Sequence, residues 1–339
     1  MYSLETVMNC CRSRIACGKR RPYYCNLLSA QDCLALNAYS PDMGNVCASG
    51  EESTELKGDE RHEIMKRRTI IVIIASLGLL PGCSTRTARS AHERTFFPPG
   101  EWVDLSHDFA ADTIYWPTAE PFKLDTVAAG ETGAGYYYSA YQFSAAEHGG
   151  THIDAPVHFA EGHRTVDQIP LEQLIGPAIK LDISAKAQGN RDYQVGVTDF
   201  ESWEKQNGKI PDDSIVLLRT GWSEYWNDRM KYLGTDKRGA EAVVELHFPG
   251  LAPEAARWLT ENRKIKAIGL DTASIDYGQS KLFESHRVLM GQNIPAFENV
   301  ANLEHLPEKV AMVIAMPMKI RGGSGGPLRI IAFVERLSH

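Results

Sequence analysis

The segment His148-Gly-Gly-Thr-His152-Ile-Asp154-Ala-Pro-Val-His158-Phe159 constrains the fold more than any other part of the chain. Its three histidines and its aspartate stand at offsets of 0, 4, 6 and 10 residues, which are all even. Even offsets place side chains on one face of an extended chain, and the glycines and the proline disfavour a helix. We therefore expect an irregular strand. Two imidazoles and a carboxylate on one face suit a divalent Zn or Mn ion.

Apolar runs rich in β-branched residues surround this segment and indicate buried strands. Two helices are indicated between some of these runs. A capping box from Thr198 to Glu201 begins one that ends near Gly208, and Pro253 begins another that continues through Leu259. Strands with interspersed helices predict one mixed α/β domain. The expected strands cover residues 178–183, 215–218, 265–270, 310–316 and 328–334.

The composition is that of a globular protein with a mildly acidic charge. The chain has 339 residues, 43% of them hydrophobic, with 36 Lys and Arg against 43 Asp and Glu and a formal net charge of −7. No basic stripe is available to neutralise phosphates, and the mild acidity argues against a nucleic-acid partner. No apolar run approaches the roughly 18 residues of a membrane-spanning helix, which excludes a polytopic membrane protein.

Cysteines are concentrated at the start of the chain: six of the seven lie in the first 47 residues, and the last is Cys83. A small disulfide or zinc module is one interpretation, but no pair has C-x-x-C spacing and no histidine lies nearby. The other interpretation is that residues 1–64 do not belong to the mature protein, because the start codon was assigned too early. The segment that follows favours the second interpretation.

Residues 65–83 have the form of a secretory signal. The basic stretch Met65-Lys-Arg-Arg68 precedes an apolar run, and the ending Leu80-Pro-Gly-Cys83 resembles a bacterial lipobox. This resemblance implies that Cys83 is lipidated; a short buried helix with a chance cysteine is the alternative. The sequence thus predicts an exported protein, anchored by lipid to a bacterial membrane and facing the periplasm or the exterior. A tether at residues 84–101 and a folded domain at residues 102–339 follow.

Motifs along residues 102–335 together resemble the metal-dependent cyclase family, which includes bacterial kynurenine formamidase and isatin hydrolase. The histidine-rich segment resembles the family signature His-x-Gly-Thr-His-x-Asp-x-Pro-x-His-Phe. The resemblance implies a single mixed-sheet domain of the swivelling β/β/α type with helices packed on the sheet. The other motifs are Asp104-Leu-Ser-His107, Trp116-Pro117, Leu218-Arg-Thr-Gly-Trp222, Phe248-Pro-Gly-Leu251, Gly269-Leu-Asp-Thr272, Glu298-Asn-Val-Ala-Asn-Leu303 and Gly322-Gly-Ser-Gly-Gly-Pro-Leu-Arg329.

The same resemblance implies roles for the residues of the histidine-rich segment. His148, His152 and Asp154 would ligate the metal. His158 would accept and donate a proton beside the metal without binding it. A histidine suits this role because its unperturbed pKa is about 6.5.

Two aromatic residues are candidates for substrate binding. The resemblance implies that Trp116 lines the substrate pocket. Phe143 belongs to an aromatic set, with residues 136–138, that is able to sandwich a flat substrate. Ordinary packing in the core is the alternative for both residues.

The two branches of the family differ in how the metal site is completed. In the formamidase branch, a histidine and a glutamate twelve residues later complete a two-metal site, and His286 and Glu298 have this spacing. In the isatin hydrolase branch, a glutamine in an Asp-Tyr-Gly-Gln-Ser motif ligates a single metal, and the motif occurs at Asp276-Tyr-Gly-Gln279-Ser280. We expect Gln279 to be the fourth ligand, with His286 and Glu298 as second-metal or supporting residues.

The glycine-rich segment around Ser324 matches G-x-S-x-G, but it lacks the strand-to-helix context of a nucleophile elbow. We expect a hairpin that borders the pocket.

Three functions remain open from the sequence. The first is a metal-dependent hydrolase that opens a cyclic or aryl amide C–N bond with metal-activated water. The second is a kynurenine formamidase with two metals. The third is an inactive lipid-anchored protein that binds metal or ligand. The expected partners are a small aromatic amide or lactam and, by the family resemblance, further copies of the chain in a homodimer or homotetramer.

Overall fold

The computed structural model describes residues 97–336. The predictions for residues 1–64, for the signal at 65–83 and for lipidation at Cys83 lie outside the described residues. The tether predicted at 84–101 lies mostly outside them as well, and its last two residues already belong to a strand that begins at Gly100. No helix among the described residues is both long and apolar enough to cross a membrane.

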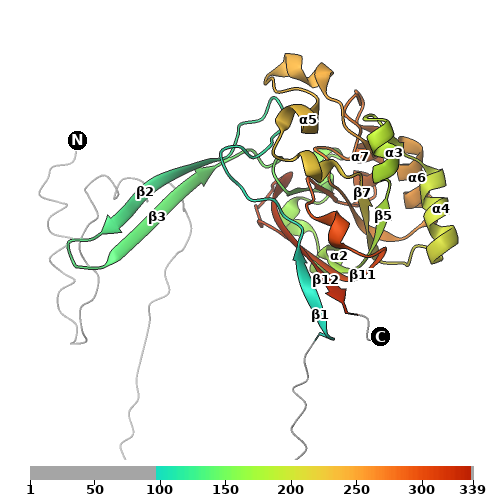
Figure 1. Ribbon diagram of the computed structural model, residues 1–339, viewed down its shortest axis with the longest axis horizontal. Coiled ribbons are helices and arrows are strands. Elements are labelled where there is room, and N and C mark those ends of the chain that lie inside the picture. The colour runs from blue at the N-terminus through green and yellow to red at the C-terminus, as the bar shows by residue number, and fades with distance from the viewer. Residues whose placement is uncertain (1–96, 337–339) are drawn as a thin grey trace, which may run out of the picture. The chain divides into compact units, whose positions relative to one another are not determined.

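One mixed sheet of eight strands forms the centre of the domain (Figure 1). β5, β7, β9 and β10 run parallel, and the other neighbours pair antiparallel. β4 also pairs with β12, so that seven of the strands close into a ring. In sheet order the strands are β1 (Gly100–Asp104), β12 (Gly325–Glu335), β11 (Lys309–Pro317), β5 (Ile175–Asp182), β7 (Ser214–Arg219), β9 (Ile265–Leu270), β10 (Ala296–Glu298) and β4 (His152–Asp154).

The core lies on both faces of this sheet, because neighbouring residues of a buried strand point to opposite sides. In β7, Val216 and Leu218 join a core with the helices, whereas Ile215 and Leu217 join a second core inside the ring. The helices are α2 (Leu171–Leu174), α3 (Ser184–Gly189), α4 (Val197–Asn207), α5 (Arg229–Leu233), α6 (Pro253–Asn262) and α7 (Glu284–Met290). Short 3₁₀ helices are η1 (Pro156–His158), η2 (Val166–Gln168), η3 (Trp222–Tyr225), η4 (Ala240–Glu245) and η5 (Leu303–His305).

The structure confirms the mixed α/β class and the five expected strands, which correspond to β5, β7, β9, β11 and β12. The helix predicted from Thr198 is α4, but its N-cap is Gly196 rather than Thr198. Asp199 forms the cap instead, since its carboxylate accepts from the Gly196 backbone N–H at 2.8 Å. The helix predicted from Pro253 is α6, which continues past Leu259 to Asn262.

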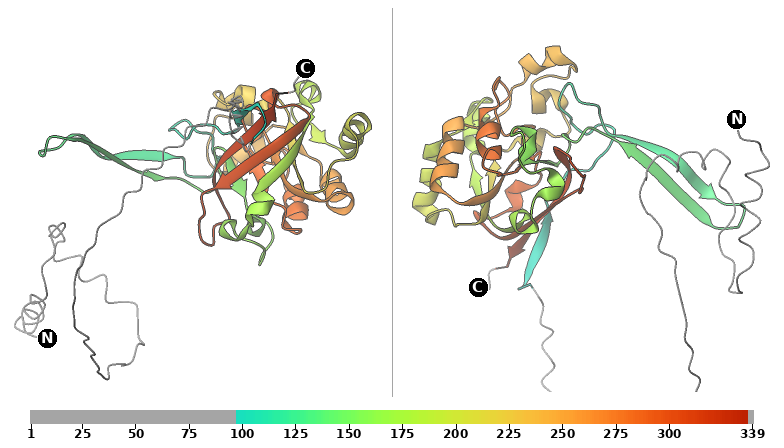
Figure 2. Two further views of the ribbon diagram at one scale, coloured as in Figure 1. Left: turned by 90° about the horizontal axis from the view of Figure 1, so that it is seen from below. Right: turned by 180° about the vertical axis from the view of Figure 1, so that it is seen from behind.

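A long hairpin leaves the domain between β1 and β4. It consists of β2 (Lys123–Glu131) and β3 (Tyr137–Ser144), which form a separate two-stranded sheet. Figures 1 and 2 show it extending away from the eight-stranded sheet. A second small sheet pairs β6 (Gln194–Val195) with β8 (Gly250–Leu251).

Candidate metal centre

The predicted ligand strand is shorter than the sequence indicates. Only His152–Asp154 form a strand, β4, which lies between β10 and β12. Pro156 then begins the 3₁₀ helix η1, whose last residue is His158. The even spacing therefore places His152 and Asp154 on one face, but His158 reaches the same site through a helical turn.

His148 reaches the site through a glycine turn. A Cβ atom on Gly149 would lie 2.0 Å from the ring of Tyr115, and Gly150 has a φ of +60°, which favours glycine. The turn brings His148 Nδ1 to 2.6 Å from Asp154 Oδ1. The first predicted ligand group, His148, His152 and Asp154, is thus assembled in the structure with ligand atoms within 4.8 Å of one another.

A second group of the same kind shares Asp154 with the first. His286 from α7 and Glu298 from β10 complete it. His286 Nε2 lies 3.2 Å from Asp154 Oδ2 and 3.1 Å from Glu298 Oε1. Glu298 Oε2 lies 3.4 Å from His152 Nε2. Two adjacent donor groups joined by one carboxylate are the arrangement of a two-metal site.

Two histidines are oriented so that their Nε2 atoms are available to bind a metal. His152 Nδ1 donates to the Gly150 carbonyl at 2.9 Å, and His286 Nδ1 donates to Asp276 Oδ2 at 2.6 Å. Such contacts select the tautomer that carries its lone pair on Nε2. His152 Nε2 is buried and has no hydrogen-bond partner. A divalent cation fits this unsatisfied atom and the carboxylates around it.

Electrostatic coupling within the cluster is strong. Burial alone would lower the pKa of His286, but hydrogen bonds from its ring to the carboxylates of Asp154, Asp276 and Glu298 outweigh burial and raise the pKa well above its usual value. Burial and the charge of Asp154 raise the pKa of Glu298. The cluster thus concentrates negative charge, which a divalent ion bound there would balance.

His158 lies beside the cluster. Its ring stacks on that of His148, with centroids 3.8 Å apart and an interplanar angle of 18°. Burial lowers the pKa of His158 to about 4, although the charge of Asp154 opposes this. The imidazole is therefore neutral at neutral pH and is able to accept a proton.

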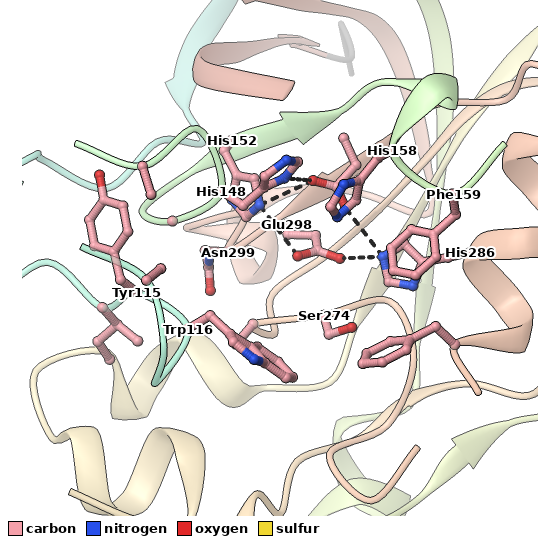
Figure 3. Close-up of a pocket in the computed structure, with 17 residues that line it drawn as sticks. Tyr115, Trp116, His148, His152, His158, Phe159, Ser274, His286, Glu298 and Asn299 are labelled. Carbon is pink, nitrogen blue, oxygen red and sulfur yellow. Dashed lines mark hydrogen bonds and ion pairs between the residues drawn. The ribbon is translucent and has the colours of Figure 1, made fainter. Parts of the chain in front are cut away.

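The cluster faces a cavity of about 310 Å³ (Figure 3). Trp116 lines this cavity, as the sequence predicts, and its ring lies edge-on to that of Phe283 at 6.3 Å. Phe159 forms a further wall, packed at 4.6 Å against the ring of His286. An apolar compartment of this size accommodates a small aromatic molecule next to the donor groups.

Gln279, the predicted fourth ligand, is not brought to the cluster. The turn at Gly278 packs on the segment before it, with the Gly278 N–H donating to Phe248 O at 2.9 Å. This turn directs the Gln279 amide to the carbonyls of Val244, at 3.3 Å, and Leu246. Gln279 is absent from the residues that line the cavity. The Asp-Tyr-Gly-Gln-Ser motif contributes to the site through Asp276 instead, which accepts a hydrogen bond from His286.

Phe143 also lies away from the cavity. It belongs to β3 of the projecting hairpin, is more than half exposed and stacks on Phe122 with centroids 5.9 Å apart. The prediction for Phe143 rested on its membership of the aromatic set, which does not show what the side chain contacts.

Ser324 contributes to the site although it is not a nucleophile elbow. It lies before β12 in the connection from β11, and the residues described after it, up to 336, form no helix. Its hydroxyl lies 2.9 Å from His148 Nε2 and donates to Glu147 Oε2 at 2.7 Å. Sequence reasoning missed Glu147 and Asp276 as orienting residues; the signal for Asp276 was its place in the Asp-Tyr-Gly-Gln-Ser motif.

Comparisons with known proteins agree with this geometry. The family model described as "Putative cyclase" matches residues 103–277. Isatin hydrolase from Roseibium aggregatum is 30% identical over 242 residues, which cover 69% of this chain and 87% of that protein. Kynurenine formamidase from Bacillus cytotoxicus is 26% identical over 231 residues, which cover 68% of this chain and 96% of that protein.

A solved structure is similar as well. Isatin hydrolase A from Ralstonia solanacearum superposes with a TM-score of 0.62 at 33% identity, covering 69% of this chain and 92% of that chain. The matched family model, the relatives and the assembled donor groups lead to the same conclusion about family and reaction class. The chain belongs to the cyclase family and is a metal-dependent hydrolase of amide C–N bonds.

Proposed function

We propose that this chain hydrolyses a small aromatic lactam or aryl amide, with isatin-like lactams as the preferred class. The observation that carries the proposal is the position of the donor groups at the wall of an aromatic-lined cavity of about 310 Å³. A flat bicyclic lactam fits between Trp116 and Phe159 with its carbonyl toward the carboxylates and imidazoles. The similarity to the isatin hydrolase of Roseibium aggregatum supports this substrate class.

His148, His152 and Asp154 would hold one divalent ion, and Asp154, His286 and Glu298 a second. Imidazole and carboxylate donors suit Zn or Mn, and the second group, with two carboxylates, favours the harder Mn. An ion bound there would polarise the substrate carbonyl and lower the pKa of a water molecule.

His158 moves the proton in this proposal. Its neutral ring accepts a proton from the attacking water and returns it to the leaving nitrogen as the C–N bond breaks. The stacking of His158 on His148 holds the ring at the cavity wall. Phe159 and Phe283 form apolar walls of the same space.

A second candidate is kynurenine formamidase activity. The observation that favours it is the second donor group, because the sequence resemblance associates His286 and Glu298 with the two-metal branch. N-formylkynurenine carries an aryl formamide, which presents the same planar amide next to an aromatic ring.

The test compares both substrates on the purified full chain reloaded with Mn or with Zn. We expect kcat/KM for isatin to exceed that for N-formylkynurenine by at least about 10-fold, equivalent to ~1.4 kcal/mol in transition-state binding. The reverse order would move the assignment to the formamidase. Hydrolysis of neither substrate, with metal bound, would overturn both.

We also propose that the protein is exported and anchored by a lipid on Cys83, which the lipobox-like ending at that residue supports. In a bacterial host, the wild-type chain is expected in the membrane fraction with an incorporated lipid label. A Cys83→Ser variant is expected to lose the label. Labelling that persists in this variant would contradict the proposal.

A further inference from the structure

Phe283 has a backbone conformation that a bulky residue rarely adopts. Its φ is +48° and its ψ is +47°, which lie in the left-handed helical region. This region brings Cβ close to a carbonyl oxygen, so it is costly for residues other than glycine and is tolerated best by Asn and Asp. The other described residues with positive φ, glycine aside, are Asp213, Asn293, Asn299 and Asn302. An aromatic residue in this conformation points to a function for its ring.

Hydrogen bonds on both sides fix the backbone of Phe283. Its N–H donates to the Ser280 hydroxyl at 3.2 Å, and its carbonyl accepts from the Arg287 N–H at 3.1 Å as α7 begins. The Ser280 hydroxyl in turn donates to Asp276 Oδ1 at 3.4 Å, and the same oxygen accepts from the Ser285 N–H at 3.1 Å. The surrounding structure thus holds the strained residue in place.

The Asp-Tyr-Gly-Gln-Ser motif therefore orients two parts of the site. Asp276 Oδ2 accepts from His286 Nδ1 at 2.6 Å, which orients a residue of the second donor group. Asp276 Oδ1 accepts from Ser280, which holds Phe283. One carboxylate supports both a metal donor and a wall of the cavity.

The ring of Phe283 packs against both aromatic walls of the cavity. Its centroid lies 6.3 Å from that of Trp116 and 5.3 Å from that of Phe159, which are ordinary distances for aromatic pairs. It also lies 6.1 Å from the ring of His286. Trp116, Phe159 and His286 surround the cavity in Figure 3. The strained residue thus lines the substrate space between these walls and close to the donor groups.

We propose that Phe283 is a specificity-determining residue, which limits the length of the aromatic group that the cavity admits. This inference rests on the proposed function, because it treats the cavity as the substrate site. The cavity holds about 310 Å³, and closely packed side chains yield little to a ligand that is too large. The left-handed conformation sets the direction of the Cα–Cβ bond, and in this conformation the ring lines the cavity.

The two residues before Phe283 lie at the surface. Lys281 is exposed, and Leu282 has 63% of its surface exposed. Neither of them lines the cavity. Removal of the Phe283 ring is therefore expected to open the cavity toward solvent rather than to leave a sealed void in the core, so that a longer ligand gains room.

The test measures the binding of two aryl hydroxamates to the purified full chain loaded with Mn, by calorimetry. The two hydroxamate oxygens suit a Mn ion, so the aryl group is placed in the cavity. Benzohydroxamate is the short probe, and 2-naphthohydroxamate, with one more fused ring, is the long probe. The variant is Phe283→Gly, because glycine adopts the left-handed conformation without strain. The matched control is Leu282→Ala, from the same segment but outside the cavity lining.

We expect the wild-type chain and Leu282→Ala to bind the short probe at least about 10-fold more tightly than the long probe. Phe283→Gly should bind the two probes within about 2-fold of each other, with its metal retained. A wild-type chain without this preference, or a preference that survives in Phe283→Gly, would overturn the proposal. Equal loss of the preference in Leu282→Ala would do the same.

The binding measurement also separates this proposal from the proposed function. If the wild-type chain shows the size preference but hydrolyses neither isatin nor N-formylkynurenine, the function is rejected and Phe283 keeps its role as a wall. Binding of neither hydroxamate by the metal-loaded wild-type chain would show that the cavity is not the substrate site. The proposal for Phe283 would then fail as well.

A second pair of variants tests the backbone strain. Phe283→Gly and Phe283→Ala both lack the ring, and they differ in the cost of a left-handed residue. We expect Phe283→Gly to unfold at the higher urea concentration, although glycine usually makes a chain less stable than alanine does. A lower midpoint for Phe283→Gly would show that residue 283 is not left-handed in solution, and would contradict the proposal.

Discussion

β4 and the β2–β3 hairpin are both built from paired strands, but they are stabilised in opposite ways. β4 has three residues, all buried, and pairs with a strand on each side. β2 and β3 have nine and eight residues, most of them exposed, and pair with each other. The short strand carries buried charged side chains, and the long hairpin carries exposed aromatic ones.

This difference shows that the packing around a strand, rather than its length, decides which side chains the strand accommodates. In β4, His152 and Asp154 are buried with their charges because neighbouring strands and helices supply partners for them. The hairpin has apolar side chains without such cover within the described residues, and a two-stranded ribbon by itself is only marginally stable in water.

Removing Asp154 is expected to have the largest effect, because both donor groups share it. In Asp154→Ala, both ions should be lost and kcat/KM should fall by at least about 10⁴-fold. Elemental analysis and kinetics measure these two losses. Asp125→Ala, an exposed aspartate of the hairpin, is the matched control and should change neither. Metal retained by Asp154→Ala would contradict the shared-carboxylate site.

Replacing His158 is expected to have the next largest effect. His158→Ala should lower kcat by about 10²- to 10⁴-fold, the usual contribution of a general base, and leave bound metal unchanged. The control is His163→Ala, from the same loop but outside the cavity lining. Equal loss of metal in His158→Ala would instead make His158 a ligand.

Asp276 tests how far the buried site depends on its supporting residues, because it contacts the donor His286 through one side-chain hydrogen bond. Asp276→Asn should weaken metal binding by about 10- to 100-fold, since His286 loses the carboxylate that orients its ring. A metal titration with a competing chelator measures this. Asp192→Asn breaks a similar contact, to His247 Nδ1 at 2.8 Å, away from the site and should leave affinity unchanged. An unaltered affinity in Asp276→Asn would remove Asp276 from the site.

The smallest effect is expected at Gln279. Gln279→Ala removes hydrogen bonds to two backbone carbonyls and should change activity by no more than about 2-fold, with full metal content. Elemental analysis is the decisive measurement. Loss of one ion in this variant would return Gln279 to the ligand set and place the chain with a single-metal arrangement.

Local spacing predicted the first donor group, because His148, His152 and Asp154 lie within seven residues and one strand orients two of them. Local spacing could not predict that His286 and Glu298 join this site. The two residues come from a helix and from a strand, and the order of strands in the sheet decides whether these elements meet. Their spacing acquired meaning only through the family resemblance.

The fold class followed from apolar runs rich in β-branched residues, which predicted five strands of the central sheet. The exposed hairpin was not predicted, because its residues alternate without a covered side. Phe143 illustrates this limit of the sequence. An aromatic residue suggests a packed neighbour, but only the three-dimensional structure shows which residues lie next to it.

The pairing of β4 with both β10 and β12 also determines when, during synthesis of the chain, the site is able to form. Asp154 lies opposite Gly325, and His152 opposite Pro327, more than 170 positions later in the chain. During synthesis, the first half of the donor set is therefore made long before the strand that closes over it. Metal loading becomes a late event, which follows release of nearly the whole chain. The compartment in which folding finishes, rather than the one in which translation begins, then determines which ion the protein acquires.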